Sequence, residues 1–134
     1  MMVWGGYRMA VIEGIVKEVL NKTEWVAIVT SGKTSHLVGT WGDYIRVLNI
    51  GEDIIVIPAG HYEKTEENLR INNKLQLLIA SKRVEGSYGP GQGCIIEGEG
   101  RIETDGEIAE KVRERFEWAR GALIIEIKAA KTQL

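Results

Sequence analysis

The stretch CIIEGEGRIET, residues 94–104, is long enough to be a complete strand and has glycines at positions 98 and 100. Glycine inside a strand often marks a bulge or a sharp bend. We therefore predict a long strand that bends as the wall of a small barrel does. The preceding residues, GSYGPGQG at 86–93, are predicted to be neither helix nor regular strand, because glycine and proline interrupt both.

Five further segments are predicted to be strands, because they are rich in β-branched, aromatic and aliphatic residues. The first two flank Gly32-Lys33-Thr34 and are predicted to form a hairpin. The five segments are EWVAIVTS at 24–31, SHLVGTW at 35–41, DIIVIP at 53–58, LQLLIAS at 75–81 and ALIIEIKAA at 122–130.

Two longer segments, residues 9–21 and 107–119, have apolar residues at helical spacing. A third, short helix is predicted to begin in KTEENLRIN, residues 64–72. The first eight residues, MMVWGGYR, have no period, so they are predicted to be a flexible lead or to precede a functional start at Met9.

Six strands and only two long helices argue against a doubly wound sheet, in which strands and helices alternate throughout. A small, mostly antiparallel barrel fits the pattern better. The 134 residues are enough for one ordinary domain, so we predict a single domain over residues 1–134.

The composition argues against several classes of protein. The formal net charge of −2 lacks the basic excess of a nucleic-acid surface. No apolar stretch approaches the roughly 20 residues that span a bilayer, and no signal peptide is visible, so we expect a soluble cytoplasmic protein. One cysteine and two histidines, without HExxH or CxxC spacing, argue against a metal centre. Cys94, in an apolar run, is either a small core residue or, less favoured, a reactive thiol.

The segment GHYEKTEENL, residues 60–69, places a lysine and a threonine where a strand gives way to a helix. We predict Thr65 as the N-cap, with Glu66 and Glu67 in the first turn, where carboxylates are favourable. Lys64 is then not needed by the helix. A lysine and a threonine at a helix start can hold a phosphate group.

Two aromatic segments lie where regular structure ends. Trp41 and Tyr44, together with Thr40, stand among glycines in GTWGDY, which is more typical of the rim of a site than of a core, although core packing remains the alternative. Trp118, beside Arg120 in FEWARGAL, is either a core residue or an aromatic wall over a bound ring.

Two other segments have a structural and a functional interpretation. Lys82 and Arg83 are either solvated surface residues or, with Lys64 and Arg70, a cluster that holds a dianionic phosphate. The loop GPGQG, 89–93, is either a flexible turn or a place where backbone approaches a ligand or a partner subunit. A strand follows it, so the dinucleotide-binding interpretation, which needs a helix there, fails.

Four segments, in this order and spacing, resemble those of the small bacterial FMN-binding proteins of the split-barrel flavoprotein family, relatives of pyridoxamine 5′-phosphate oxidase. The resemblance runs from about Asn21 to the C-terminus. It implies a six-stranded antiparallel split β-barrel of Greek-key type with flanking helices, and a homodimer with one FMN per subunit near the dimer interface. The segments are HLVGTWGDYIRVL, IPAGHYEKTEENL, SKRVEGSYGPGQG and FEWARGALIIEI.

The resemblance also implies roles for single residues. Lys64 and Thr65 match the pair that binds the flavin phosphate, Thr40 and Trp41 match a segment along the isoalloxazine ring, and Trp118 matches an aromatic residue near that ring.

Two further matches concern glycines. The loop of Gly89, Pro90 and Gly91 matches one close to the cofactor and the interface. Gly39 departs from the family pattern, which has asparagine there, so backbone must replace a side-chain contact to the flavin.

The sequence thus predicts an FMN-binding flavoprotein that acts in electron transfer or as an FMN-dependent oxidoreductase, such as a flavin reductase that takes hydride from a nicotinamide cofactor. The alternative is a non-redox binding or dimeric interaction module on the same barrel, which holds another phosphate-bearing ligand. Pyridoxamine-phosphate oxidase activity is less favoured, because no second basic cluster for a substrate phosphate is visible.

Overall fold

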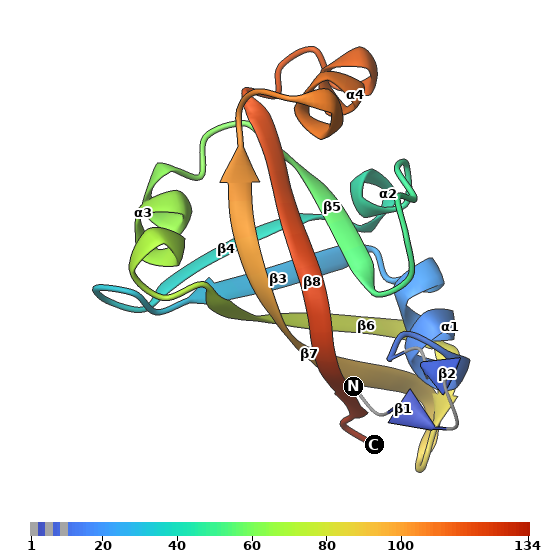
Figure 1. Ribbon diagram of the computed structural model, residues 1–134. Coiled ribbons are helices and arrows are strands. Elements are labelled where there is room, and N and C mark those ends of the chain that lie inside the picture. The colour runs from blue at the N-terminus through green and yellow to red at the C-terminus, as the bar shows by residue number, and fades with distance from the viewer. Residues whose placement is uncertain (1–2, 5–6, 9–10) are drawn as a thin grey trace.

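The computed structural model describes residues 3–4, 7–8 and 11–134 (Figure 1). Six long strands form one antiparallel sheet in the order β4-β3-β6-β7-β8-β5. Their bounds are β3 Trp25–Thr30, β4 His36–Trp41, β5 Ile54–Ala59, β6 Lys74–Gly86, β7 Gly89–Glu103 and β8 Gly121–Thr132. Strands β3, β4 and β6 cross the direction of β5 and β8, and the sheet curls into a barrel that is open between β4 and β5 (Figure 1). The predicted six-stranded split barrel with flanking helices is confirmed.

Strand β7 makes the curl possible, because it belongs to both halves of the sheet. Its register with β8 shifts between Glu97 and Gly98. A Cβ atom at Gly98 would lie 2.6 Å from the carbonyl oxygen of Glu126, and one at Gly100 would lie 2.7 Å from Cδ2 of Leu75. The strand bends where neighbouring groups approach the backbone too closely for any side chain, as the two glycines predicted.

The segment GSYGPGQG is regular strand for most of its length, so the prediction of an irregular run is wrong. Glu85 pairs with Pro90 and Gly86 with Gly89, which leaves a two-residue turn at Ser87 and Tyr88. The pairing is carried by backbone groups, which glycine supplies as well as any other residue. Gly89 and Gly91 have φ angles of +115° and +120°, which residues with a side chain rarely adopt.

In the described part of the chain, four helices flank the sheet: α1 Gly14–Lys22, α2 Gly42–Ile45, α3 Glu63–Ile71 and α4 Glu107–Arg115. The short α2 was not predicted, because four residues are too few to show a helical period. Helix α4 ends at Arg115, so Phe116 and Trp118 lie in the loop after it rather than on its last turn.

The first helix begins later than the predicted Met9, at Gly14. The backbone N–H groups of Val11 and Ile12 donate to the carboxylate of Asp53 at 2.8–2.9 Å, and Glu13 is extended. Met9 and Ala10 lie outside the described residues. Of the predicted flexible lead, Val3–Trp4 (β1) and Tyr7–Arg8 (β2) pair as short antiparallel strands, and the other residues lie outside the described part.

The main core fills the barrel between the curled sheet, α1 and α3, and a second cluster lies between α4 and the pair β5 and β8. Cys94 is fully buried in the main core, and burial raises the pKa of its thiol. Among the described residues, no helix has the length and apolar character needed to cross a membrane. The largest fully buried side chains are Ile28, Ile57, Leu77, Ile79, Ile96, Leu123, Ile124, Ile125 and Ile127.

Candidate functional site

A pocket of about 400 Å³ lies where the ends of β3 and β4, the loop between β5 and α3, and the loop after α4 meet. We call it the aromatic pocket, because five of its nine lining residues are aromatic other than histidine. It contains three of the sequence-predicted contacts to the flavin ring and Gly39. Its lining residues are Trp25, Gly39, Thr40, Trp41, Tyr44, Gly60, His61, Tyr62 and Trp118.

The pocket has two aromatic walls. On one wall, Trp25 and Trp41 lie directly opposite each other in the β3–β4 pairing, and their rings meet edge to face at 4.7 Å. On the other wall, the ring of Tyr44 lies 5.8 Å from that of Trp118. Such a cleft suits a flat ring system, since aromatic faces and edges stack well on one another.

Alternation along β4 places neighbouring residues on opposite faces. Thr40 is buried at 6% exposure, whereas Trp41 is half exposed. Thr40 therefore faces the protein interior at the base of the pocket, and Trp41 stands at its rim.

Tyr62 ties the two ends of the site together. It has a left-handed backbone conformation with φ +58°, directly before the start of α3, and its hydroxyl donates to the carbonyl of Gly39 at 3.0 Å. Burial raises the pKa of Tyr62, and a hydrogen bond with the side chain of Thr40 offsets part of that increase. The start of α3 is thus fixed relative to β4 by a half-buried phenol.

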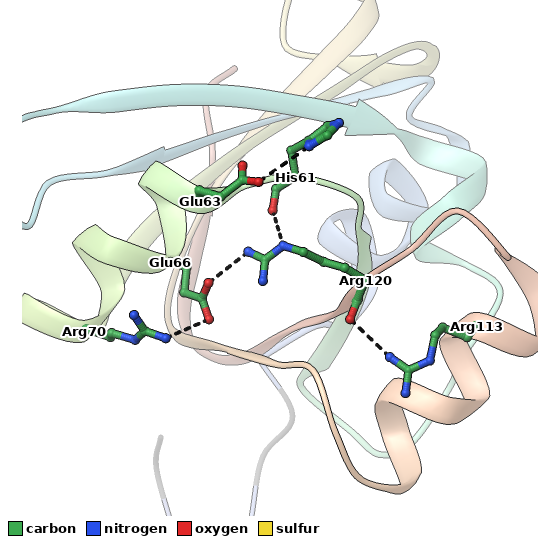
Figure 2. Close-up of polar contacts among 6 residues, drawn as sticks. All are labelled: His61, Glu63, Glu66, Arg70, Arg113 and Arg120. Carbon is green, nitrogen blue, oxygen red and sulfur yellow. Dashed lines mark hydrogen bonds and ion pairs between the residues drawn. The ribbon is translucent and has the colours of Figure 1, made fainter.

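Arg120 holds the loop between β5 and α3 in place (Figure 2). Its Nε donates to the carbonyl of His61 at 2.8 Å, and its Nη2 donates to Glu66 at 2.9 Å. Arg113 in turn donates to the carbonyl of Arg120 at 3.1 Å. The guanidinium makes these bonds in a fixed planar fork, so the loop and the first turn of α3 are positioned together.

The helix start differs from its prediction. The N-cap is Tyr62, not Thr65, and no side chain caps the first turn. The first N–H groups of a helix have no partner within it, so those of Glu63, Lys64 and Thr65 are free of intrahelical bonds. The prediction placed the N-cap three residues too late, because a tyrosine in the left-handed region is uncommon and gives no sequence signal.

Thr65 is fully buried, and its hydroxyl is the one buried side-chain polar atom without a hydrogen-bond partner among the described residues. Lys64, next to it, is exposed and forms no ion pair within the described part of the chain. An unpartnered buried hydroxyl costs about 1–3 kcal/mol, so its retention at this place requires a reason.

The carboxylates of α3 are engaged elsewhere. Glu66 contacts both Arg120 and Arg70, the latter at 3.2 Å (Figure 2). The pKa of Glu63 is lowered, chiefly by its own backbone N–H and then by His61, whose Nδ1 lies 3.5 Å away.

Other predicted residues do not line the aromatic pocket. Lys82 and Arg83 line a separate hollow of about 630 Å³, and Arg70 pairs with Glu66. Gly89, Pro90 and Gly91 belong to the β6–β7 hairpin, which lies beside α1 and away from α3 in Figure 1. The predicted single cluster of Lys64, Arg70, Lys82 and Arg83 is therefore not formed within one chain.

Three features of the site were not predicted from the sequence: Trp25, Tyr62, and the role of Arg120 in holding the loop before α3. Trp25 could have been found from the predicted hairpin, because a two-strand pairing brings its first residue opposite the last residue of the partner strand. Tyr62 and Arg120 act through contacts between distant segments, which local patterns do not reveal.

No family model matches the chain. A curated FMN-binding protein from Nitratidesulfovibrio vulgaris (strain DSM 19637 / Miyazaki F) is 39% identical over 124 residues, which cover 92% of this chain and 99% of that protein. The chain belongs to this family of FMN-binding proteins. The resemblance seen in the sequence is thereby confirmed.

Several solved structures share the fold of this chain at low sequence identity. HupZ from group A Streptococcus has a TM-score of 0.67 at 13% identity, over 87% of this chain and 92% of that one. An FMN-binding protein from Syntrophomonas wolfei subsp. wolfei has a TM-score of 0.61 at 16% identity, over 87% and 82%. A protein from Listeria innocua assigned as a pyridoxamine 5′-phosphate oxidase has a TM-score of 0.62 at 16% identity, over 88% and 94%. These likenesses support the split-barrel fold of the family member described here.

Proposed function

We propose that this protein binds FMN, with the isoalloxazine ring in the aromatic pocket and the phosphate at the start of α3, and that it acts in electron transfer or as an FMN-dependent oxidoreductase. The observation that carries the proposal is the unpartnered buried hydroxyl of Thr65 at an uncapped helix start, three residues beyond the pocket-lining Tyr62. The family membership supports the same cofactor, because the curated relative is an FMN-binding protein.

The residues at the phosphate end fit a dianion. Lys64 offers a charge that no carboxylate neutralises among the described residues, and Glu66 is held by Arg120 and Arg70 rather than turned toward the helix start. The N–H groups of Lys64 and Thr65, which have no partner within the helix, and the positive end of the helix dipole add to this. Thr65 would donate its enclosed hydroxyl to the phosphate, which would supply the partner that this hydroxyl lacks. Each charge-assisted hydrogen bond of this kind contributes roughly 1.5–3 kcal/mol.

The residues at the ring end fit a flat, partly polar ring. Trp41 and Trp118 supply stacking surfaces, and Thr40 with the backbone of Gly39 supplies polar groups at the base. Two or three phosphate contacts together with stacking reach micromolar affinity, about −8 kcal/mol.

FMN supplies the redox chemistry when bound, by accepting and releasing electrons as hydride or singly. The chain's own residues bind it, orient it and limit the access of water. Among the pocket-lining residues, Tyr62 has a raised pKa and stays a neutral phenol, so it serves as a hydrogen-bond donor rather than as a base. The half-open pocket leaves room for a donor or acceptor to approach the ring.

The proposed assembly is a homodimer formed through the outer face of the sheet. This outer face comprises Ala27, Val29, Leu37, Leu78 and Ile95, which share one side of β3, β4, β6 and β7 by their register. Leu37 is 69% exposed and Leu78 is 45% exposed. Gln76 and Glu97 share this face by the same register. A group of exposed apolar residues on one side of a sheet is typical of an interface. Lys82 and the Gly89–Gly91 hairpin, which do not line the pocket of their own chain, would then contact FMN only from the second subunit.

The deciding experiment is an absorption spectrum of the purified protein, with FMN loaded by titration and followed by flavin fluorescence. We expect a yellow protein with a dissociation constant on the order of micromolar. Lys64→Ala should weaken binding about tenfold or more, since it removes one charge-assisted contact. Lys111→Ala, which removes an exposed lysine from α4, is the matched control and should leave binding unchanged.

The outcomes separate the alternatives. Flavin bands that bleach with NADH at a catalytic rate identify a reductase, and bands that persist until a chemical reductant is added identify an electron carrier. A colourless protein that takes up no FMN would instead support a non-redox binding module. Equal FMN affinity of wild type and Lys64→Ala would remove Lys64 from the phosphate site.

A further inference from the structure

Trp25 occupies the space that a side chain at position 39 would need. A Cβ atom added to Gly39 would collide with the Cζ2 and Cε2 atoms of the Trp25 indole and would lie 2.6 Å from its Nε1. The contact follows from the hairpin register, in which Trp25 pairs with Trp41 and Ala27 with Gly39, so that the indole of Trp25 lies diagonally across to Gly39 on the same face. The Trp25 indole therefore fits in this place only because residue 39 has no side chain.

The indole remains open to a ligand. Trp25 is 48% exposed, lines the aromatic pocket, and is braced by the ring of Trp41 at an interplanar angle of 83°. Within the described ranges its Nε1–H forms no hydrogen bond. An indole has one donor and no acceptor, so this group can serve only an acceptor on a ligand.

We propose that Trp25 is a ring-recognition residue of the flavin site, which walls the pocket over Gly39 and donates its indole N–H to an acceptor at the polar edge of the isoalloxazine. This inference rests on the proposed FMN binding. At Gly39 in β4, backbone groups alone would otherwise contact the flavin. Trp25, from the neighbouring strand β3, would then supply a side-chain contact at this place.

The proposed contact has a consequence for the redox chemistry. Reduction adds negative charge to the flavin ring, and a donor N–H directed at the ring edge stabilises that charge in a partly water-excluded site. Trp25 therefore favours the reduced cofactor and raises its reduction potential. A residue that only covers the sheet face would not affect the potential.

The test uses the full chain loaded with FMN, and measures the dissociation constant by fluorescence titration and the reduction potential by spectroelectrochemistry. Trp25→Phe keeps a stacking ring without a donor and should weaken binding about two- to tenfold, the range of one neutral hydrogen bond, and lower the potential. Trp25→Ala should weaken binding about tenfold or more, because the wall is also lost. Ile15→Ala, at an exposed apolar residue of α1 that lies outside the pocket and the outer face, is the control and should change neither quantity.

A double-mutant cycle tests the pairing with Gly39. Gly39→Ala should weaken FMN binding in the wild-type background, because the new Cβ displaces the indole, and should have little effect in the Trp25→Ala background. Thermal unfolding of each variant without FMN shows whether it is folded, and Trp25→Phe provides the test if Trp25→Ala is not.

Two negative results are distinguishable. A wild-type protein that binds no FMN overturns the proposed function itself. A wild-type protein that binds FMN, with unchanged affinity and potential in both Trp25 variants, overturns the role of Trp25 and leaves the proposed function standing.

Discussion

At the scale of single residues, the site depends on groups whose pairing crosses from one segment to another. Tyr62 is the clearest case, because its hydroxyl holds the backbone at Gly39 while its own backbone starts α3. One phenol thus fixes the distance between the proposed ring end and the proposed phosphate end. A sequence pattern could place Thr40, Trp41 and Trp118 near a ligand, but it could not reveal Tyr62, whose role follows from a contact between residues 23 positions apart.

Tyr62→Phe tests this link through its pH dependence. Burial raises the folded-state pKa of Tyr62 above its value in the unfolded chain, so the stabilising effect of the phenol is fully present below the unfolded pKa and is lost as the pH rises through the folded pKa. Phenylalanine cannot ionise. At about pH 8 the variant should be roughly 0.5–1.5 kcal/mol less stable, through the lost bond to Gly39, and the difference should shrink above about pH 10.

Urea unfolding midpoints at several pH values measure this difference. Tyr88→Phe, at an exposed turn residue, controls for the loss of a phenol. A stability difference between wild type and Tyr62→Phe that is constant across the alkaline range would contradict the role of the Tyr62 phenol.

At the scale of elements, the sequence located the strands better than the segments that join them. Strands were recognisable because β-branched and aliphatic residues run together in 24–31 and 122–130. The β6–β7 hairpin was missed, because glycine and proline give no side-chain signal although their backbones pair. The start of α3 was misplaced for a related reason, because no capping side chain marks it. It is set by the backbone conformation of Tyr62 and by Arg120, which lies in the loop before β8.

Arg120→Ala tests whether this clamp positions α3. Its side chain is 30% exposed and bonds both the His61 carbonyl and Glu66. We expect a loss of about 1.5–3 kcal/mol in unfolding free energy, as for bonds to a charged group, and weaker FMN binding because the helix start is no longer fixed. Arg120→Lys should recover little of either, since an ammonium lacks the planar fork.

Thermal unfolding and FMN titration check both effects. Arg115→Ala, an exposed arginine at the end of α4, is the matched control. Unchanged FMN affinity in a folded Arg120→Ala protein would show that the helix start is positioned without the clamp.

At the scale of the whole molecule, the curled sheet has two sides with different uses. Its inner side holds the main core, whereas the outer face carries exposed leucines beside a pocket that is open at one rim. Burying the outer face against a second copy would cover apolar surface at roughly 25 cal/mol per Å² and would bring another chain close to the aromatic pocket. This dimer was predicted only from the family resemblance, because which side of a strand faces outward depends on the register.

Leu78→Lys tests the proposed dimer, because a lysine in the middle of the outer face would place an unpaired charge in the interface. We expect sedimentation to show a shift from dimer toward monomer, with a loss of FMN affinity if the second subunit contributes to the site. Ile15→Lys is the control. Ile15 lies on α1, has the size of leucine and is 45% exposed, as Leu78 is, so its replacement should leave the dimer intact. A wild-type protein that sediments as a monomer at all concentrations would contradict the dimer. A dimer unaffected by Leu78→Lys would place its interface elsewhere.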